Sequence, residues 1–150
     1  MKKFICFALV AVTLILCLSS CATNYASSSL KSKLEKAGYT VEEYTKSGFE
    51  SAQRGGTLKT SEMDGLEKVL YAYKKASGDT EEGILILVFD SSKNAEKYGS
   101  TNNGQATETI SLMHSFGKKI APESDSSVYG IANNIIWAGS SAARTAAGIQ

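Results

Sequence analysis

Residues 83–90 read GILILVFD, an apolar run that is uninterrupted until Asp90. A strand with one face in water alternates apolar and polar side chains, whereas a continuous apolar run of this length is typical of a strand covered on both faces. The run therefore predicts a central strand with other elements packed on each side of it.

The segment before this run predicts its hairpin partner. Residues 66–75 fit the spacing of a helix as well as that of a strand, and Val69, Tyr71 and Tyr73 share one face if the segment is a strand. The turn-forming sequence SGDT at 77–80 separates the two apolar segments. Two strands joined by such a turn form a hairpin, and this favours the strand.

Helices and strands are intermixed along the rest of the chain. The segment 40–46 is read as a strand because of its β-branched and aromatic residues, although Thr40 and Glu43 could also open a helix as a capping box. Further helices are expected at 30–37, 92–98, 106–116 with Gly117 as its end, and 140–147, a further strand at 134–138, and loops at 47–65 and 121–128. We therefore expect an α+β fold, an antiparallel sheet of about four strands packed with two to four helices, as a single domain over residues 30–150.

The N-terminus has the pattern of an export signal. Lys2 and Lys3 precede an apolar stretch, residues 4–18, that carries no charge and gives way to small residues. A secretory signal has this order, and a membrane-spanning helix needs about 20 apolar residues, more than are present. Residues 1–20 are therefore predicted to be a signal peptide.

Residues 18–21 read LSSC and resemble the lipobox of bacterial lipoproteins. The resemblance implies cleavage between Ser20 and Cys21, a diacylglycerol on the Cys21 thiol, and a protein held by membrane lipid on the side facing away from the cytoplasm. Ordinary secretion or an uncleaved anchor are the alternatives. Residues 21–29 are then expected to be the lipidated cysteine and a flexible tether. Because Ala22 follows the cysteine, the resemblance implies the outer membrane if the host has two membranes.

The domain itself offers a weaker resemblance. The stretches AGYTV at 37–41 and FDSSKNAEKY at 89–98, with the final strand, glycine and small-residue helix, are similar to small uncharacterised bacterial lipoproteins. This resemblance implies no known activity.

Processing would also remove the free thiols. Cys6 and Cys17 lie in the signal and Cys21 would carry lipid, so disulfides, thiolate zinc sites and cysteine nucleophiles are excluded. Without Lys2 and Lys3, 14 basic residues stand against 15 acidic residues in the remaining 130. The charges are interspersed, so no nucleic-acid partner is expected. No cofactor is expected either.

Few residues suggest catalysis. His114 is the only histidine, and Ser115 and Lys118 fit the S-x-x-K pattern of penicillin-interacting serine enzymes. The companion motifs S-x-N and K-T-G are absent, and 130 residues are too few for that fold. A small envelope hydrolase using Ser115, Lys118 and His114 is therefore the alternative hypothesis.

Tyrosines are the most suggestive residues of the domain. On a sheet, Tyr71, Tyr73 and Trp137 could form a binding face for an unknown envelope protein, a peptide or a glycan. We therefore expect a lipid-anchored, non-enzymatic binding module. A solute-capture lipoprotein is a further alternative, although 130 residues fall short of the usual two-lobed architecture.

Overall fold

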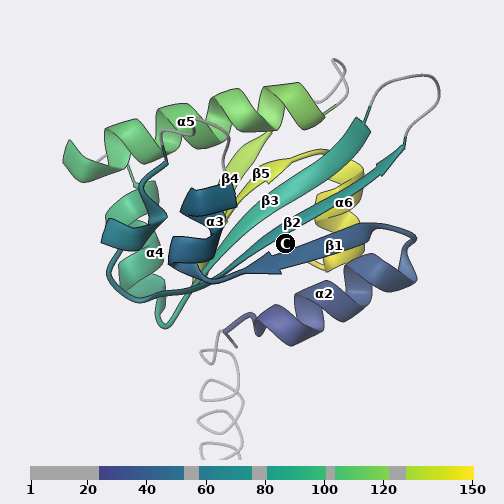
Figure 1. Cartoon of the computed structure of the whole chain (residues 1–150), viewed down its shortest axis with the longest axis horizontal. Helices are drawn as coiled ribbons and strands as arrows, with labels where there is room; N and C mark the ends of the chain where they lie inside the picture. The colour runs from purple at the N-terminus through teal and green to yellow at the C-terminus, as the bar shows by residue number, and fades with distance from the viewer. Residues whose placement is uncertain (1–23, 53–57, 76–80, 101–103, 122–127) are drawn as a thin grey trace, which may run out of the picture.

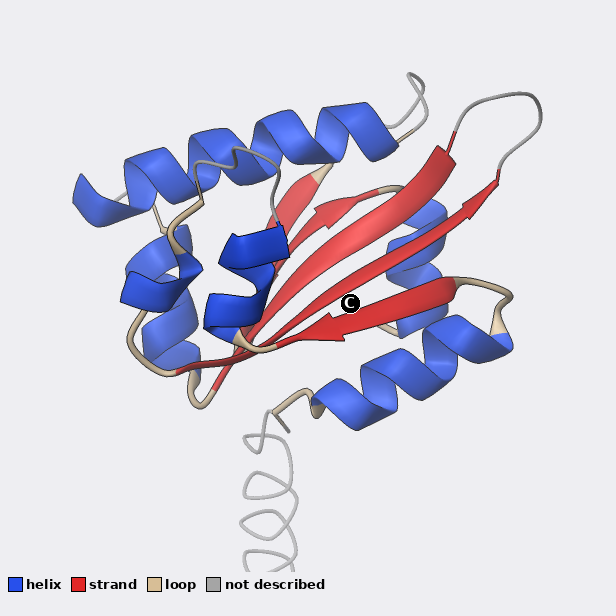
Figure 2. Ribbon diagram, in the orientation of Figure 1, coloured by secondary structure: helices blue, strands red, loops and turns tan. Residues whose placement is uncertain are grey.

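Five antiparallel strands form one sheet in the order β1-β2-β3-β5-β4, with helices on both of its faces (Figures 1 and 2). This computed structural model describes residues 24–52, 58–75, 81–100, 104–121 and 128–150. Its elements are α2 (Ser27–Lys36), β1 (Thr40–Tyr44), α3 (Lys46–Ala52), the 3₁₀ turn η1 (Thr60–Glu62), β2 (Leu66–Lys75), β3 (Glu81–Phe89), α4 (Ser92–Gly99), α5 (Gly104–Ile120), β4 (Tyr129–Ala132), β5 (Ile135–Gly139) and α6 (Ser141–Ala147). The expected α+β class, with an antiparallel sheet in a single domain, is confirmed.

Strand β3 lies at the centre of the sheet, as its continuous apolar run predicts. Residues 84–89 are each at most 2% exposed, and β3 pairs with β2 on one side and β5 on the other. The β2–β3 pairing runs from Leu66 opposite Phe89 to Lys75 opposite Glu81. The predicted hairpin is therefore confirmed, and both 40–46 and 66–75 contain strands.

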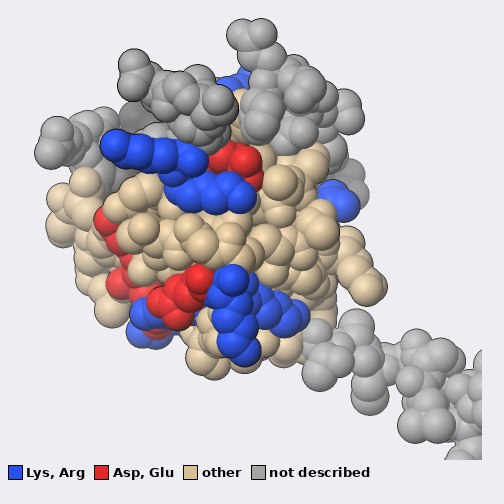
Figure 3. Space-filling view, turned by 90° about the vertical axis from the view of Figure 1, so that its right-hand side faces the viewer, with Lys and Arg blue, Asp and Glu red and all other residues tan. Residues whose placement is uncertain are grey.

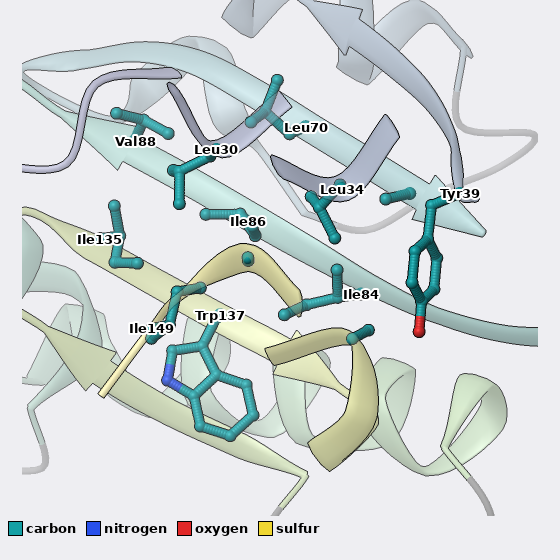
Figure 4. Packing of buried hydrophobic residues seen from close by; sticks show 13 residues of the cluster. Leu30, Leu34, Tyr39, Leu70, Ile84, Ile86, Val88, Ile135, Trp137 and Ile149 are labelled. Carbon is teal, nitrogen blue, oxygen red and sulfur yellow. The ribbon is translucent and has the colours of Figure 1, made fainter. Parts of the chain in front are cut away.

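The two faces of the sheet carry separate apolar cores. On one face, Leu30 and Leu34 of α2 pack with Ile84, Ile86 and Trp137, and α6 lies beside α2 (Figure 4). The other face is covered by α3, α4 and α5 and has its own core, built from Phe49, Met63, Leu66, Val69, Leu85, Leu87, Phe89, Ala95, Tyr98 and Met113 among others. A sheet with helices on both faces explains why β3 has no polar side.

Capping side chains begin two of the helices. The Ser91 hydroxyl accepts a hydrogen bond from Asn94 N at the start of α4, and the Ser140 hydroxyl accepts one from Ala143 N at the start of α6. Such caps satisfy backbone N–H groups that have no partner inside the helix. At the other end of α6, Gly148 has a φ of 73°, a left-handed conformation that glycine adopts without strain.

The expected tether is wrong for residues 25–29. Helix α2 begins at Ser27, and Tyr25 packs against the core on the α2 side of the sheet. The side chain of Asn134 also bonds the backbone of Tyr25 at both N and O. The serine-rich sequence is therefore part of the domain, because tertiary contacts order a segment whose composition alone predicts flexibility.

Three further expectations differ from the structure. The expected loop 47–65 contains α3 and η1, since burial of Phe49 stabilises a short helix in spite of its glycine. Gly117 lies inside α5 and does not end it. Strand β4 was not predicted, because its four half-buried residues have no strand-like pattern and form a strand only by pairing with β5.

Candidate functional site

Tyr71 and Tyr73 lie on β2 and point to the α3–α5 side of the sheet with Val69, as the strand interpretation predicts. Their rings stack with centroids 5.2 Å apart and planes inclined by 28°. Tyr71 also contacts Phe116 of α5 edge-on, with ring centroids 5.7 Å apart, and this contact joins the pair to α5. Both tyrosines are half-buried.

Trp137 does not belong to this face. It lies on β5 opposite Ile86 of β3, and it is 3% exposed in the core under α2. Ile86 in turn lies opposite Leu70, the neighbour of Tyr71, and successive residues of a strand point to opposite faces. The expected face of Tyr71, Tyr73 and Trp137 is therefore wrong for the tryptophan.

Strand β1 supplies the residues that complete the tyrosine pair. Glu42 lies opposite Tyr71 and Tyr44 lies opposite Val69, so both side chains share the face of Tyr71 and Tyr73. The Tyr44 hydroxyl donates to Glu42 Oε2, and the Tyr73 hydroxyl donates to Glu42 Oε1 at 3.4 Å. We call this group of four residues, Glu42, Tyr44, Tyr71 and Tyr73, the tyrosine surface.

The electrostatics of the tyrosine surface follow from these hydrogen bonds. The bond to the Glu42 carboxylate, with a smaller effect of burial, raises the pKa of Tyr44 to about 12. Tyr44 therefore stays neutral across the physiological pH range, and its hydroxyl donates a hydrogen bond to the carboxylate. Phe49 of α3 supports the Tyr44 ring edge-on, with centroids 5.6 Å apart.

Sequence reasoning missed Glu42 and Tyr44 as members of the site. The alternation of residues 40–44 would have placed their side chains on one face of a strand, because they are two positions apart. Which strand they would meet, and at which register, depends on the β1–β2 pairing, which no local pattern specifies.

The three residues of the hydrolase hypothesis lie on α5. His114, Ser115 and Lys118 are exposed, whereas Met113 and Gly117 on the same helix are buried. The described residues show no hydrogen bond or ion pair among these three side chains, although a nucleophile is normally activated by a base within hydrogen-bonding distance. The arrangement resembles the solvent side of an amphipathic helix.

A partly buried polar cluster joins the residue before β1, strands β2 and β3, and the residue before α6. The hydroxyls of Tyr39 and Ser140 both donate to Glu82 Oε1, the latter at 3.2 Å, and Lys74 Nζ lies 3.7 Å from the same oxygen. Lys74 also lies over the Tyr39 ring, 4.4 Å from its centroid. Burial and the bond to Glu82 raise the pKa of Tyr39 above its usual value. This cluster ties together four parts of the chain.

A cavity of about 220 Å³ lies between η1, α4 and α5. Its lining combines apolar and charged residues: Leu58, Lys59, Glu62, Met63, Tyr98, Glu108, Thr109 and Leu112. Pockets for drug-sized ligands have volumes of roughly 300–1,000 Å³, so this cavity suits only a smaller molecule.

Other kinds of site can be assessed only within the described ranges. There, no group of three or more His, Cys, Asp or Glu residues is placed to hold a metal ion. None of the helices in these ranges has both the length and the apolar character needed to cross a membrane. On the face shown in Figure 3, acidic and basic side chains lie beside one another. Ser20 and Cys21, with the whole of 1–20, lie outside the described residues.

No family model, no curated protein and no solved structure matches this chain.

Proposed function

We propose that this chain is a lipid-anchored protein of the cell envelope, exposed outside the cytoplasm, whose domain is a non-enzymatic binding module. The anchoring is supported by the charged start, the apolar residues 4–18 and the LSSC sequence that ends at Cys21. Two acyl chains on one cysteine would hold the protein firmly, whereas a single chain binds a membrane only marginally.

The observation that carries the binding role is the tyrosine surface. Three half-buried tyrosines lie beside one carboxylate, which accepts hydrogen bonds from two of them. Aromatic side chains of this kind contribute large contact area while their polar ends stay hydrated. A glycan strand offers both matching features, apolar C–H faces for the rings and hydroxyl donors for Glu42.

The anchoring is tested by metabolic labelling with radioactive palmitate. The wild-type protein should carry label and float with membranes, and Cys21→Ser should carry none. Ser20→Ala serves as a matched control, because alanine is also a small residue and should still permit labelling. Labelling that persists in Cys21→Ser would overturn the anchoring.

The binding role is tested by sedimentation with purified, insoluble cell-wall glycan. The wild-type protein should sediment with the glycan, and Tyr73→Leu and Glu42→Gln should each weaken sedimentation about tenfold, the loss of one or two buried contacts. Ser115→Ala, at an exposed position of α5, is the control and should bind as the wild type does. Equal sedimentation of all four proteins, or none for the wild type, would overturn the tyrosine surface as a glycan site.

A further inference from the structure

Basic side chains outnumber acidic ones on helices α2 and α6. Helix α2 carries Lys31, Lys33 and Lys36 against one acidic residue, Glu35, and α6 contributes Arg144 with no acidic residue. We call Lys31, Lys33, Lys36 and Arg144 the basic surface.

Most of this charge is unpaired within the described part of the chain. Lys31 lies 3.7 Å from Glu43, but Lys33, Lys36 and Arg144 form no ion pair with a described carboxylate. Lys33 and Lys36 are exposed. The guanidinium of Arg144 lies over the Trp137 ring, 5.1 Å from its centroid, and its buried Nε has no hydrogen-bond partner.

The two helices form one continuous surface. Helices α2 and α6 are in contact, and a Cβ placed on Gly148 at the end of α6 would lie 2.7 Å from Lys33 Nζ. The Lys33 ammonium therefore reaches across to α6. Its positive charge there also suits the C-terminal end of a helix, where the helix dipole is negative.

The opposite layer has no such excess of charge. The described segments 46–52, 58–64, 90–100 and 107–121 contain equal numbers of basic and acidic residues. The basic residues are Lys46, Lys59, Lys93, Lys97, Lys118 and Lys119, and the acidic residues are Glu50, Glu62, Asp64, Asp90, Glu96 and Glu108. The positive excess is thus specific to the α2–α6 side.

The chain enters the domain on this same side. Tyr25 packs against the core beneath α2 and α6, and its hydroxyl accepts a hydrogen bond from Gln150 N at 3.4 Å. An extended chain spans at most about 3.6 Å per residue, so the Cα atoms of Cys21 and Tyr25 are no more than about 14 Å apart. A lipid on Cys21 would therefore keep the α2–α6 layer close to the membrane.

We propose that the basic surface docks on anionic lipid headgroups. This inference rests on the proposed lipidation of Cys21, which supplies proximity, while the lysines and Arg144 supply the charge complementarity. Docking orients the domain: the tyrosine surface, on the opposite face of the sheet, then points away from the membrane toward ligands in the envelope.

The test uses the acylated protein in vesicles of phosphatidylcholine, with or without phosphatidylglycerol. The mature chain has no other cysteine, so Ser32→Cys on α2 and Ser115→Cys on α5 can each carry a single fluorophore. A nitroxide attached to lipid headgroups then quenches whichever label lies near the surface. With phosphatidylglycerol, the label at position 32 should be quenched several-fold more than the label at position 115.

Charge variants separate docking from anchoring. Lys33→Gln with Lys36→Gln should lower quenching at position 32 several-fold, to the level seen at position 115, because each cation near an anionic surface strengthens docking. High salt and vesicles of phosphatidylcholine alone should act in the same direction. Lys118→Gln with Lys119→Gln removes equal charge from α5 and should change nothing.

The outcomes distinguish the two proposals. If the protein floats with vesicles but both labels are quenched equally, or quenching at position 32 ignores the lysine substitutions, docking is overturned and anchoring stands. If the protein with Cys21 intact fails to float, the anchoring itself is overturned, and docking with it.

Discussion

Asn134 holds the backbone of Tyr25, 109 residues away in the sequence, by two hydrogen bonds: Oδ1 accepts from Tyr25 N at 2.6 Å, and Nδ2 donates to Tyr25 O at 3.1 Å. The same Nδ2 donates to Phe89 O at 2.7 Å. One amide side chain, 3% exposed, therefore fixes the start of the domain to the β4–β5 turn and to the end of β3.

We expect Asn134→Ala to lower the free energy of unfolding by about 2–3 kcal/mol, because it leaves buried backbone groups of Phe89 and Tyr25 without partners. Urea titration followed by circular dichroism measures the change. Asn24→Ala, at an exposed neighbouring position, is the control and should cost less than about 0.5 kcal/mol. If Asn134→Ala lowered the free energy of unfolding by no more than Asn24→Ala, the hydrogen bonds of the Asn134 side chain would not stabilise the fold.

Gly117→Ala tests why a glycine is tolerated within α5. In an exposed helix this substitution stabilises by about 1 kcal/mol. Here a Cβ would lie 2.2 Å from the backbone oxygen of Val128, so we expect the sign to reverse and the protein to lose about 2 kcal/mol or more through overpacking. The midpoint of urea unfolding measures this effect.

Gly48→Ala in α3 is the matched control for Gly117→Ala. Its Cβ would meet only the side-chain oxygen of Thr45, at 2.9 Å, which can move aside more easily than backbone. We expect a change within about 1 kcal/mol. Equal effects of the two substitutions would argue against close packing of α5 on Val128.

Alkaline titration tests the bond between Tyr44 and Glu42. Phenolate absorbance in the ultraviolet should show Tyr44 ionising near pH 12, and Glu42→Gln should lower its pKa toward the usual value of 10.0. Tyr44→Phe identifies the contribution of this residue. Tyr129, whose pKa burial raises to about 12, is an internal control that Glu42→Gln should leave unchanged.

The raised pKa of Tyr44 also sets the sign of its effect on stability. The folded protein holds the phenol proton more tightly than the unfolded chain, so this contribution is complete below pH 10 and is lost as the pH rises through about 12. The free energy of unfolding should therefore fall less steeply over this window in Glu42→Gln than in the wild type. An identical pH dependence in the two proteins would show that Glu42 does not raise the pKa of Tyr44.

A double-mutant cycle tests the polar cluster at Glu82. Tyr39→Phe and Glu82→Gln each disturb the hydrogen bond between the two side chains. Hydrogen bonds to charged groups contribute about 1.5–3 kcal/mol, so we expect a coupling energy of about 1–2 kcal/mol between the substitutions. Additive effects would mean that the contact does not stabilise the protein. Tyr39→Phe combined with Ser91→Ala, at the distant cap of α4, should be additive.

Much of the fold is predictable from local pattern. The β2–β3 hairpin follows from two apolar segments around SGDT, the central place of β3 follows from its continuous apolar run, and α2, α4 and α6 follow from spacing and caps. Each of these signals acts over a few residues, within one element or one turn. The site was only half predicted: Tyr71 and Tyr73 share a face, but Glu42 and Tyr44 were missed.

What the sequence by itself determined is therefore most of the helices and strands and the resemblance to a lipoprotein signal that ends at Cys21. Apart from the β2–β3 hairpin, the tertiary structure alone decided which elements meet. The pairing of β5 with β3 placed Trp137 on the face opposite Tyr71, α5 continued through Gly117 where Val128 packs closely against it, and Asn134 bound the backbone of Tyr25 at the start of the domain. The physical reason is the same in each case: these outcomes depend on contacts between residues far apart in the chain, and local patterns carry no information about such partners.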